Sequence, residues 1–497
     1  MDRGMNQGSW FTRGNVTVDP LSAALAVDDP AIIELLDCDS GEFVDAKSWI
    51  GGWRYEQLIR ERLEIKERQL EQPRFRCSLC SVPVYLVSNQ FKRFFFRHAM
   101  EDGSCPGETR SPLTREEILA RKYDGVRESA PHRRIKALIV RSLLTDPAFS
   151  GVLSERQWRS SHDPRSRRQP DVQAIGPLGR VAFEVQLSTT FLDVVAARRN
   201  FYRQEDALLV WIMGGFDPDY RRLTTDDLFF SNNSNFLVID EETTALSENS
   251  GKFHVRCHFR RPARNGNQLV DSWESSLIPF DELTYETASQ RCWHFDYDGQ
   301  AEAVRAEIER DRLQCEEAAS QALREGLFSF WLERAPNSRP DRDSILAWSA
   351  LRRASAAHHG LALPPSPDDD SSLVALMNGL ASAKEGHPVG WSFKHLIEVG
   401  HRIAEAYPHH VVAFGHAIRH FGMENLLDAQ DRTGKWKARK VAIRRSLEKR
   451  EPKFMPDAAS LPLLVLLIPE VGEKLQSLIA KANSINAAAS SEGETIK

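Results

Sequence analysis

The sequence predicts an α/β protein whose core is a mixed β-sheet flanked by helices, with a small cysteine-containing unit before the core and an all-α region after it. Three observations lead to this prediction. Between residues 125 and 213, a helical pattern is followed by a strand hairpin, a second helical pattern and an apolar strand. Residues 71–110 carry closely spaced cysteines, and residues 300–484 are helical in pattern. A hairpin pairs strands antiparallel and a helical crossover pairs them parallel, so the core sheet should be mixed.

The composition is that of an ordinary globular protein. The 497 residues are too many for one hydrophobic core, so we expect several domains. Hydrophobic residues make up 41% and charged residues 27% of the chain, and the net charge of −5 is no signature of nucleic-acid binding by the whole chain. The seven cysteines are an odd number and three of them cluster, which favours metal binding in a reducing compartment over a disulfide framework.

No segment predicts export or membrane insertion. The N-terminus lacks a basic stretch followed by an apolar one. The longest apolar run, Leu461 to Pro469, is interrupted by Pro462 and is far shorter than the ~20 residues of a membrane-spanning helix. We therefore expect a cytoplasmic protein that does not bind a membrane.

The N-terminal region, residues 1–70, is expected to combine strands with one helix. Residues 31–44 have the pattern of a small strand-and-turn unit, and residues 48–70 are helical in pattern and highly charged. Pro73 closes this helix. We interpret the helix as a solvated face with a narrow apolar stripe.

Residues 71–110 are predicted to form a zinc ribbon. Cys77 and Cys80 have the two-residue spacing that lets both thiolates reach one ion, and an aromatic hairpin follows them. His98 and Cys105 can supply the third and fourth ligands. Four nitrogen and sulfur ligands close a tetrahedral site, the arrangement of structural zinc. The ion would staple a unit that is too small to have a core of its own.

A second domain is predicted over residues 125–295. Its first helix can be capped by Ser129, and Pro131 fits the first turn. A strand-like segment follows at residues 152–160, and residues 168–188 read as two strands joined by a Gly-Pro-Leu-Gly turn.

The second half of this domain is expected to extend the same sheet. The segment after Ser188 reads as a helix, and the apolar run 207–213 fits a strand that is covered on both faces. Residues 216–285 look strand-rich, with turns rich in Asn, Ser and Gly.

The strand pair at residues 168–188 carries the candidate catalytic carboxylates. Asp171 begins the first strand and Glu184 lies on the second, where it shares a face with Gln186. Such a pair can hold Mg²⁺ or Mn²⁺, which prefers one or two carboxylates together with waters and substrate phosphate. That ion would activate water and stabilise the leaving oxygen in phosphodiester hydrolysis. The Val185 carbonyl could add a ligand, and Glu155, one strand earlier, is a further candidate carboxylate.

Gln186 cannot supply positive charge at this site, so another residue would have to do so. A glutamine can orient water or phosphate by hydrogen bonding, but it carries no charge. Lys136 or His132, which share one face of the first helix, could supply the charge.

The first half of the domain is rich in arginine. Phosphate contacts by such residues give sequence-independent, salt-dependent binding to nucleic acid. The candidate nucleic-acid-binding residues are Arg133, Arg134, Arg165, Arg167 and Arg168.

The order of elements and the spaced Asp…Glu-x-Gln resemble the PD-(D/E)xK restriction-like nuclease superfamily. The segment from Cys77 to Met213 is more closely similar to the CoiA-like competence protein family, in which a zinc ribbon precedes a nuclease core with Gln in place of Lys. The matching residues are Cys77, Cys80, His98 and Cys105 in the ribbon, Pro170-Asp171 and Glu184-Val185-Gln186-Leu187-Ser188 in the core, and Glu128 to His132 with Lys136 in the preceding helix.

This resemblance implies a restriction-endonuclease-like core with an N-terminal zinc ribbon and a metal-dependent nuclease activity on DNA. It implies a role in DNA uptake and recombination or in defence against foreign DNA. The alternative is a catalytically weak or inactive nucleic-acid-binding protein that retains the nuclease fold, and Gln186 is the residue that favours this alternative.

The C-terminal region, residues 300–484, is expected to be helical and to offer a surface for protein partners or DNA. Its histidines fall mostly on separate helical segments, and we interpret them as core or surface residues. The tail 485–497 is small and polar, which predicts disorder.

Overall fold

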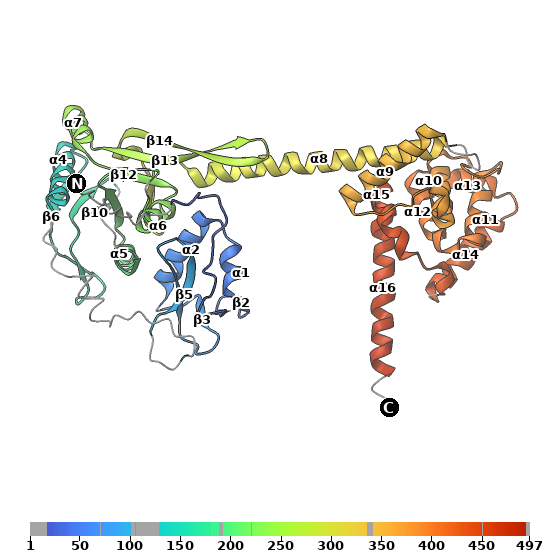
Figure 1. Cartoon of the computed structure of the whole chain (residues 1–497), viewed down its shortest axis with the longest axis horizontal. Coiled ribbons are helices and arrows are strands. Elements are labelled where there is room, and N and C mark those ends of the chain that lie inside the picture. Colours follow the sequence, from blue (N-terminus) through green and yellow to red (C-terminus); the bar gives the residue numbers. More distant parts are fainter. Residues whose placement is uncertain are drawn as a thin grey trace, which may run out of the picture. The chain divides into compact units, whose positions relative to one another are not determined.

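The computed structural model describes residues 17–69, 71–100, 105, 129–177, 179–187, 192–219, 221–334, 341–449 and 451–493 (Figure 1). The chain divides into two compact units, Met1–Ile308 and Glu309–Lys497. The first unit combines strands and helices, and the second is built from helices. No helix among the described residues is long and apolar enough to cross a membrane.

A seven-stranded mixed sheet forms the centre of the first unit. Its strand order is β14-β13-β12-β11-β10-β9-β6. The pairs β10–β11 and β11–β12 are parallel, and the other four pairs are antiparallel. The strands are β6 (Ser150–Ser154), β9 (Val172–Gly176), β10 (Gly179–Gln186), β11 (Leu208–Met213), β12 (Asn235–Val238), β13 (His254–Asn265) and β14 (Gln268–Pro279).

The sequence around β9 and β10 explains their hairpin. The turn ends at Gly179, whose φ of +86° lies in the left-handed region that glycine adopts without strain. On β10, Phe183 and Val185 pack into one apolar core while Ala182 packs into another on the opposite face. This alternation confirms the prediction that Glu184 faces away from Phe183 and Val185.

Helices cover both faces of the sheet. Helix α4 (Ala130–Thr145) packs on the face that carries Phe183 and Val185, and α7 (Glu241–Ser250) lies beside α4. Helices α5 (Leu192–Gln204) and α6 (Leu223–Ser231) pack on the opposite face (Figure 1). Helix α5 connects the parallel strands β10 and β11, and α6 connects the parallel strands β11 and β12. Ser129 caps α4 by accepting a hydrogen bond from the His132 N–H, as its sequence predicts.

The N-terminal residues form a small sheet, two helices and a hairpin. The elements are β1 (Glu34–Asp37), β2 (Phe43–Asp45), α1 (Ala46–Gly51), α2 (Tyr55–Arg68), β3 (Phe75–Cys77), β4 (Val84–Ser88) and β5 (Phe94–His98). Strands β2, β1 and β3 form one sheet, and β4 pairs with β5. Helix α2 is more than a solvated surface helix, because Leu58, Ile59 and Leu63 are buried in a core shared with α5 and α6.

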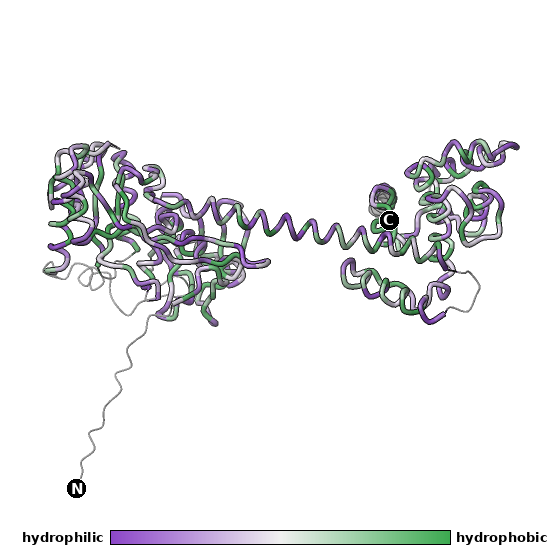
Figure 2. Tube along the Cα trace, turned by 90° about the horizontal axis from the view of Figure 1, so that it is seen from above, coloured by the Kyte–Doolittle hydropathy of each residue, from purple (hydrophilic) through white to green (hydrophobic). Residues whose placement is uncertain are grey.

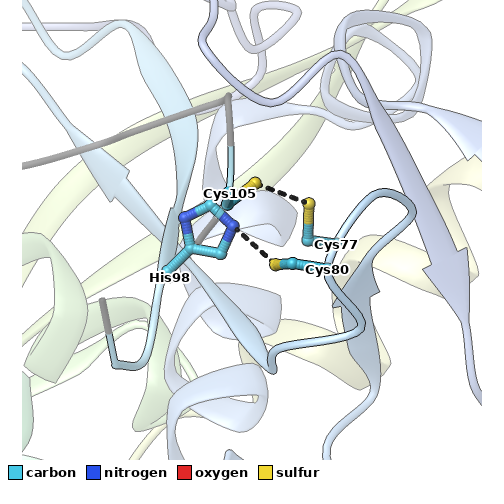
Figure 3. Close-up of side chains that lie close together, drawn as sticks. All are labelled: Cys77, Cys80, His98 and Cys105. Carbon is cyan, nitrogen blue, oxygen red and sulfur yellow. Dashed lines mark hydrogen bonds between the residues drawn. The ribbon is translucent and has the colours of Figure 1, made fainter. Parts of the chain in front are cut away.

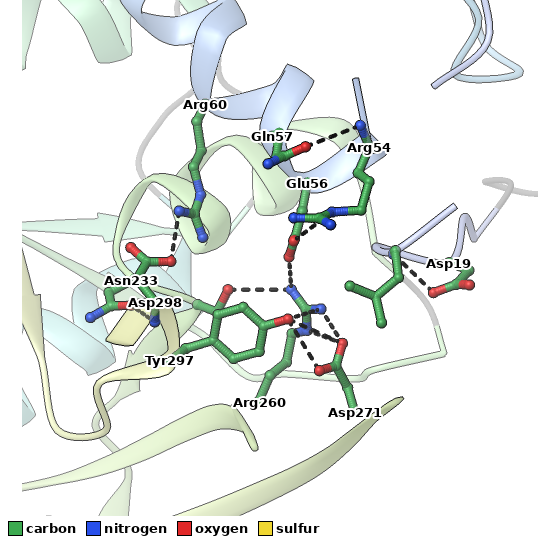
Figure 4. A network of polar contacts seen from close by, with 12 residues as sticks. Asp19, Arg54, Glu56, Gln57, Arg60, Asn233, Arg260, Asp271, Tyr297 and Asp298 are labelled. Carbon is green, nitrogen blue, oxygen red and sulfur yellow. Dashed lines mark hydrogen bonds and ion pairs between the residues drawn. The ribbon is translucent and has the colours of Figure 1, made fainter. Parts of the chain in front are cut away.

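Two buried ionic networks join the N-terminal elements to the large sheet. In the first, the fully buried Arg260 of β13 donates to Glu56 of α2 at 2.6 Å and to the Tyr297 hydroxyl at 2.6 Å, and it also pairs with Asp271 of β14 (Figure 4). A buried charge of this kind is stable only when it is fully paired. The network therefore fixes α2 against β13 and β14.

The second network surrounds Asp226 of α6, which is fully buried. Its carboxylate accepts hydrogen bonds from Tyr55 of α2 at 2.8 Å, from Lys92 of the β4–β5 turn at 2.6 Å and from Arg221 at 2.8 Å. The β4–β5 hairpin is thus packed and charge-paired within the first unit.

Several local expectations were wrong. The predicted strand 152–160 is interrupted, because Glu155 has a φ of +53°, and β7 (Trp158–Arg159) leaves the large sheet to pair with β8 (Arg167–Arg168). The region 216–285 extends the sheet through β12, β13 and β14, as predicted, but it also contains the unpredicted helices α6 and α7. Asp240 and Thr243 form a capping box that starts α7, a signal readable from the sequence. The remaining short elements are η1 (Phe280–Glu282), β15 (Thr284–Glu286) and β16 (Arg291–Trp293).

Helix α8 (Tyr297–Glu333) begins in the first unit and ends in the second. Its central part is largely hydrophilic, as the colours in Figure 2 show. The other helices are α9 (Arg342–His359), η2 (Pro367–Asp369), α10 (Ser371–Glu385), α11 (Leu396–Ala406), η3 (Pro408–His410), α12 (Val411–His420), α13 (Glu424–Gln430), α14 (Lys435–Glu448), η4 (Pro452–Phe454), η5 (Ala458–Ser460), α15 (Leu461–Leu467) and α16 (Pro469–Gly493).

One apolar core holds the second unit together. It includes Trp331 of α8, Leu380 of α10, Phe414 of α12 and Leu464 of α15. Helix α16 runs to Gly493, past residue 485 where the sequence predicts disorder, and the alanine-rich composition there favours helix. The prediction for residues 494–497 lies outside the described residues.

Candidate functional site

The predicted Cys/His residues gather at one end of the β4–β5 hairpin. Cys77 ends β3, Cys80 lies in the following turn, His98 ends β5, and Cys105 comes seven residues later (Figure 3). Their ligand atoms all lie within 4.8 Å of one another. The Cys80 Sγ is 3.4 Å from His98 Nε2, and the Cys77 Sγ is 3.8 Å from the Cys105 Sγ. This set of one nitrogen and three sulfur atoms could hold a metal ion such as zinc.

The thiols of this cluster have unequal acidities. Burial raises the pKa of Cys77, but hydrogen bonds from the backbone at Cys80 and Leu79 and from His98 outweigh it and lower that pKa to about 7. Burial and the neighbouring thiols raise the pKa of Cys80 to about 11. Thiols held this close oppose each other's ionisation, and a bound cation would remove that repulsion.

The second group of interest lies where β9 begins and β10 ends. The register pairs Val172 with Phe183, so Asp171, one residue before β9, lies opposite Glu184. The Asp171 carboxylate accepts a 2.8 Å hydrogen bond from the Val185 N–H. The hairpin therefore brings together the two carboxyl groups that the sequence predicts to act as a pair.

Glu184 is buried against α5. Its side chain is 1% exposed, it forms an ion pair with Arg198, and it accepts a 3.4 Å hydrogen bond from the Tyr202 hydroxyl. Burial raises the pKa of the Glu184 carboxyl to about 8, and the Asp171 carboxylate adds to the rise, while Arg198 and Tyr202 oppose it. The Glu184 carboxyl thus carries a proton more readily than an exposed glutamate does.

Asp171 has the opposite tendency. Burial raises its pKa, but the hydrogen bonds from His132 and the Val185 N–H and the charges of His132 and Arg198 hold it below the ordinary value. The His132 Nε2 lies 3.4 Å from the Asp171 carboxylate and 3.3 Å from the Val185 carbonyl oxygen. Neighbouring carboxyl groups with pKa values pushed apart are typical of sites for acid–base or metal chemistry.

The other predicted catalytic residues lie nearby in different settings. Gln186, the last residue of β10, is 5% exposed. Lys136 is buried on α4 and forms an ion pair with Glu155. Among the described residues, the Cys/His group alone brings three or more ligand atoms within 4.8 Å. Glu155 therefore does not complete a three-carboxylate cluster with Asp171 and Glu184.

The predicted nucleic-acid-binding arginines are distributed over two surfaces. Arg133 and Arg134 are exposed on α4, where Arg134 pairs with Glu241 of α7. Arg165 and Arg167 are exposed near the short β7–β8 ribbon. Arg168 lies over the Phe201 ring, with its guanidinium carbon 5.4 Å from the ring centroid. Of the five, Arg168 is the one whose charge acts on Tyr202, the partner of Glu184.

Two residues of the site, Arg198 and Tyr202, were not predicted. They are four residues apart on α5 and therefore lie on one side of that helix. A helix that follows a central strand packs back onto it, so charged and aromatic residues at this spacing were a usable signal. The sequence does not show which residue of β10 they meet.

Two families of unknown function match the first unit. One described as Domain of unknown function (DUF7830) matches residues 41–112, and one described as Domain of unknown function (DUF6035) matches residues 116–298. The first match includes the Cys/His cluster and the second includes the Asp171–Glu184 pair. No curated protein and no solved structure matches the chain.

Proposed function

We propose that this chain is a metal-dependent nuclease-like protein that acts on DNA, with a restriction-endonuclease-like core and an N-terminal zinc ribbon. The observation that carries the proposal is the pairing of Asp171 with Glu184 across β9 and β10, at one end of a mixed sheet flanked by helices. The resemblance of this segment to the CoiA-like competence proteins supports the same conclusion. DNA uptake and recombination, or defence against foreign DNA, are the roles that fit.

The proposed reaction is hydrolysis of a phosphodiester. A water oxygen attacks phosphorus, the bond to the leaving oxygen breaks, and the proton lost by the water balances the one that the leaving oxygen gains. A bound Mg²⁺ or Mn²⁺ supplies water activation and charge neutralisation in such a reaction. The donor set fits this ion, because Asp171, Glu184 and the Val185 carbonyl present hard oxygen atoms at one end of the sheet.

Arg198 is proposed to supply the cation that Gln186 cannot. Its guanidinium touches Glu184 and its side chain is 30% exposed, so it can contact both the buried pair and a phosphate. Positive charge aimed at a developing phosphate charge contributes most in a partly dehydrated site. His132, which lies against Asp171, is proposed to keep that carboxylate ionised and oriented.

Zinc is the proposed ion of the Cys/His cluster. Three sulfur ligands and one nitrogen ligand suit zinc better than a hard ion such as Mg²⁺. We propose a ribbon over residues 71–110 and a nuclease-like domain over residues 125–295. The two family matches end and begin between these ranges and support that division.

The test is cleavage by purified full-length protein. Single- and double-stranded DNA and RNA are incubated with Mg²⁺ or Mn²⁺, beside Asp171→Ala, Glu184→Ala and the control Glu274→Ala, which removes a partly exposed carboxylate of β14. Wild type should cleave DNA, the two site variants should lose about 100-fold or more, and the control should match wild type. Cleavage that survives both site substitutions would overturn the assignment.

The role of Arg198 has its own comparison. Arg198→Gln should lower kcat by about 100-fold, and Arg198→Lys should recover part of the loss by restoring the charge. Equal activity of the Gln and Lys variants would assign the side chain to packing against Trp211, whose ring it approaches.

The second candidate function is nucleic-acid binding without turnover. Gln186 stands at the end of β10 where the nuclease superfamily has lysine, and His132 and Arg198 already contact the two carboxyl groups. Tight, salt-sensitive DNA binding in the absence of any cleavage would favour this function over the first.

A further inference from the structure

Helix α14 in the second unit carries an unusual concentration of positive charge. Six of its fourteen residues are Lys or Arg, and one is Glu. Lys437, Lys440 and Arg444 follow one another at three- and four-residue spacing, so they lie along one face of the helix, and all three are exposed. We call this set the α14 cation row.

Most of these cations pair with no carboxylate in the part of the chain that the structure describes. Lys440 lies 3.1 Å from Asp428, whereas no carboxylate of the described residues contacts Lys437 or Arg444. The same holds for the exposed neighbours Lys435, Arg445 and Lys449. The exposed Arg312 of α8, in contrast, pairs with Glu309 and Glu316 of its own helix. The α14 cation row is therefore available to an external anion.

The helix dipole does not account for the cations at the start of α14. Lys435 and Lys437 lie in the first turn, where the helix dipole disfavours cations, and that turn contains no acidic residue. Asp431 partly compensates by accepting hydrogen bonds from the backbone N–H groups of Trp436 and Lys437. Positive charge retained at an unfavourable position is consistent with a ligand that is itself negative.

The buried side chains of α14 anchor the helix and bear on the kind of ligand. Trp436 and Ile443 are 4% and 9% exposed and belong to the core of the second unit. Trp436 packs so tightly on Gly400 of α11 that a side chain there would clash. A membrane-surface helix must free its apolar face for lipid. In α14 the large apolar side chains Trp436 and Ile443 are already buried. Val441, 44% exposed beside the row, offers too little apolar surface to hold the helix on a membrane.

We propose that the α14 cation row binds the phosphate backbone of nucleic acid, as a second DNA-binding surface remote in sequence from Asp171 and Glu184. From Lys437 to Arg444 the helix rises about 10 Å, a span over which duplex DNA presents several phosphates. Binding of the α14 cation row would depend on the charge of the phosphates and not on the base sequence.

The experiment measures binding and not cleavage, so its outcome does not depend on the proposed nuclease chemistry. Full-length protein carrying Asp171→Ala, without added divalent ion, is titrated into labelled single- and double-stranded DNA of about 30 residues over a range of salt concentrations. The test variant is Lys437→Gln/Lys440→Gln/Arg444→Gln. The matched control is Arg342→Gln/Arg353→Gln/Lys474→Gln, which removes the same charge from exposed positions of α9 and α16.

Neutralising the α14 cation row should weaken DNA binding by about ten-fold or more at low salt and reduce the salt slope by about two to three. The control should stay within about two-fold of the parent protein, and circular dichroism should show equal helix content in all three. Unchanged binding by the test variant, or an equal loss in the control, would overturn the proposal. The same proteins are also sedimented with phosphatidylserine vesicles. If the test variant loses vesicle binding but keeps DNA binding, the row belongs to a membrane interaction and the proposal is overturned.

Discussion

At the scale of single residues, several ionisable groups are buried in surroundings that disfavour their charged form. Glu184 is one, and its raised pKa follows from burial beside Asp171. His410 is another, in the second unit, where it is 1% exposed with its Nε2 2.8 Å from the Ser372 hydroxyl. No described residue hydrogen-bonds to its buried Nδ1. Burial, followed by the charge of His409, lowers the pKa of His410 to about 4.

This lowered pKa predicts acid sensitivity of the second unit. Between pH ~6.5 and ~4 the unfolded chain binds a proton at His410 that the folded chain does not. The free energy of unfolding is therefore unaffected by His410 above pH ~6.5 and decreases as the pH falls below that value. The loss by pH ~4 should reach roughly 3 kcal/mol. His410→Asn, which cannot titrate, should remove this part of the pH dependence.

The protein is equilibrated in urea at several pH values and then labelled by a brief pulse of hydrogen exchange at one pH. The exchange in peptides of α10 and α12 reports the unfolding of the second unit. His358→Asn, at an exposed position of α9, is the control and should follow wild type. Parallel pH dependence of wild type and His410→Asn would contradict the prediction.

At the scale of elements, α4 shows how a cap positions a functional side chain. Ser129 holds the first turn by accepting from the His132 N–H at 3.3 Å, and the His132 ring then reaches the Val185 carbonyl of β10. One capping hydroxyl therefore fixes both the start of the helix and the placement of a residue at the candidate site.

Removal of this cap should destabilise the first unit. Ser129→Ala should lower the free energy of unfolding by about 1 kcal/mol, because an N–H of the first turn loses its acceptor. Ser129→Asp keeps an acceptor and adds a favourable charge near the helix N-terminus, so it should restore stability. The two variants are compared by urea unfolding, and equal stability of the Ala and Asp variants would show that the cap is dispensable.

At the scale of the whole molecule, the hairpin that carries the Cys/His cluster packs against several other elements of the first unit. The β4–β5 hairpin shares a core with α2, α5 and α6, and Lys92 in its turn pairs with the buried Asp226. Loosening of the hairpin would expose that carboxylate network as well as the apolar core. A metal ion at the cluster would thereby stabilise elements far from it in sequence.

Metal removal should therefore destabilise the first unit and spare the second. Chelation, or Cys77→Ser, should increase hydrogen exchange in β4, β5 and α6 and leave α10 and α12 unchanged, and zinc should reverse the effect of chelation. Cys315→Ser, at an exposed position of α8, is the matched control. Less than about half an equivalent of zinc in soluble protein, or exchange unaffected by chelation, would count against the ribbon.

Local signals were sufficient for much of the fold. The strand pair around Asp171 and Glu184 was predictable because alternation and a glycine turn act over a few residues. The short helix α6 was missed because its sequence, LTTDDLFFS, has no clear helical period. It is stabilised by Asp226 pairing with Arg221, just before the helix, and with Lys92, 134 residues away. Glu155 was misplaced because one left-handed residue turned the strand away from the sheet.

The sequence by itself determined which groups could act: the four Cys/His ligands at ribbon spacing, the Asp171–Glu184 pair and the uncharged Gln186. Only the tertiary structure decided what those groups meet. It placed Arg198 and Tyr202 against Glu184, His132 against Asp171, and Glu155 with Lys136. The physical reason is that residue spacing fixes the face of a strand or helix, whereas the partner on that face depends on how helices pack across the sheet.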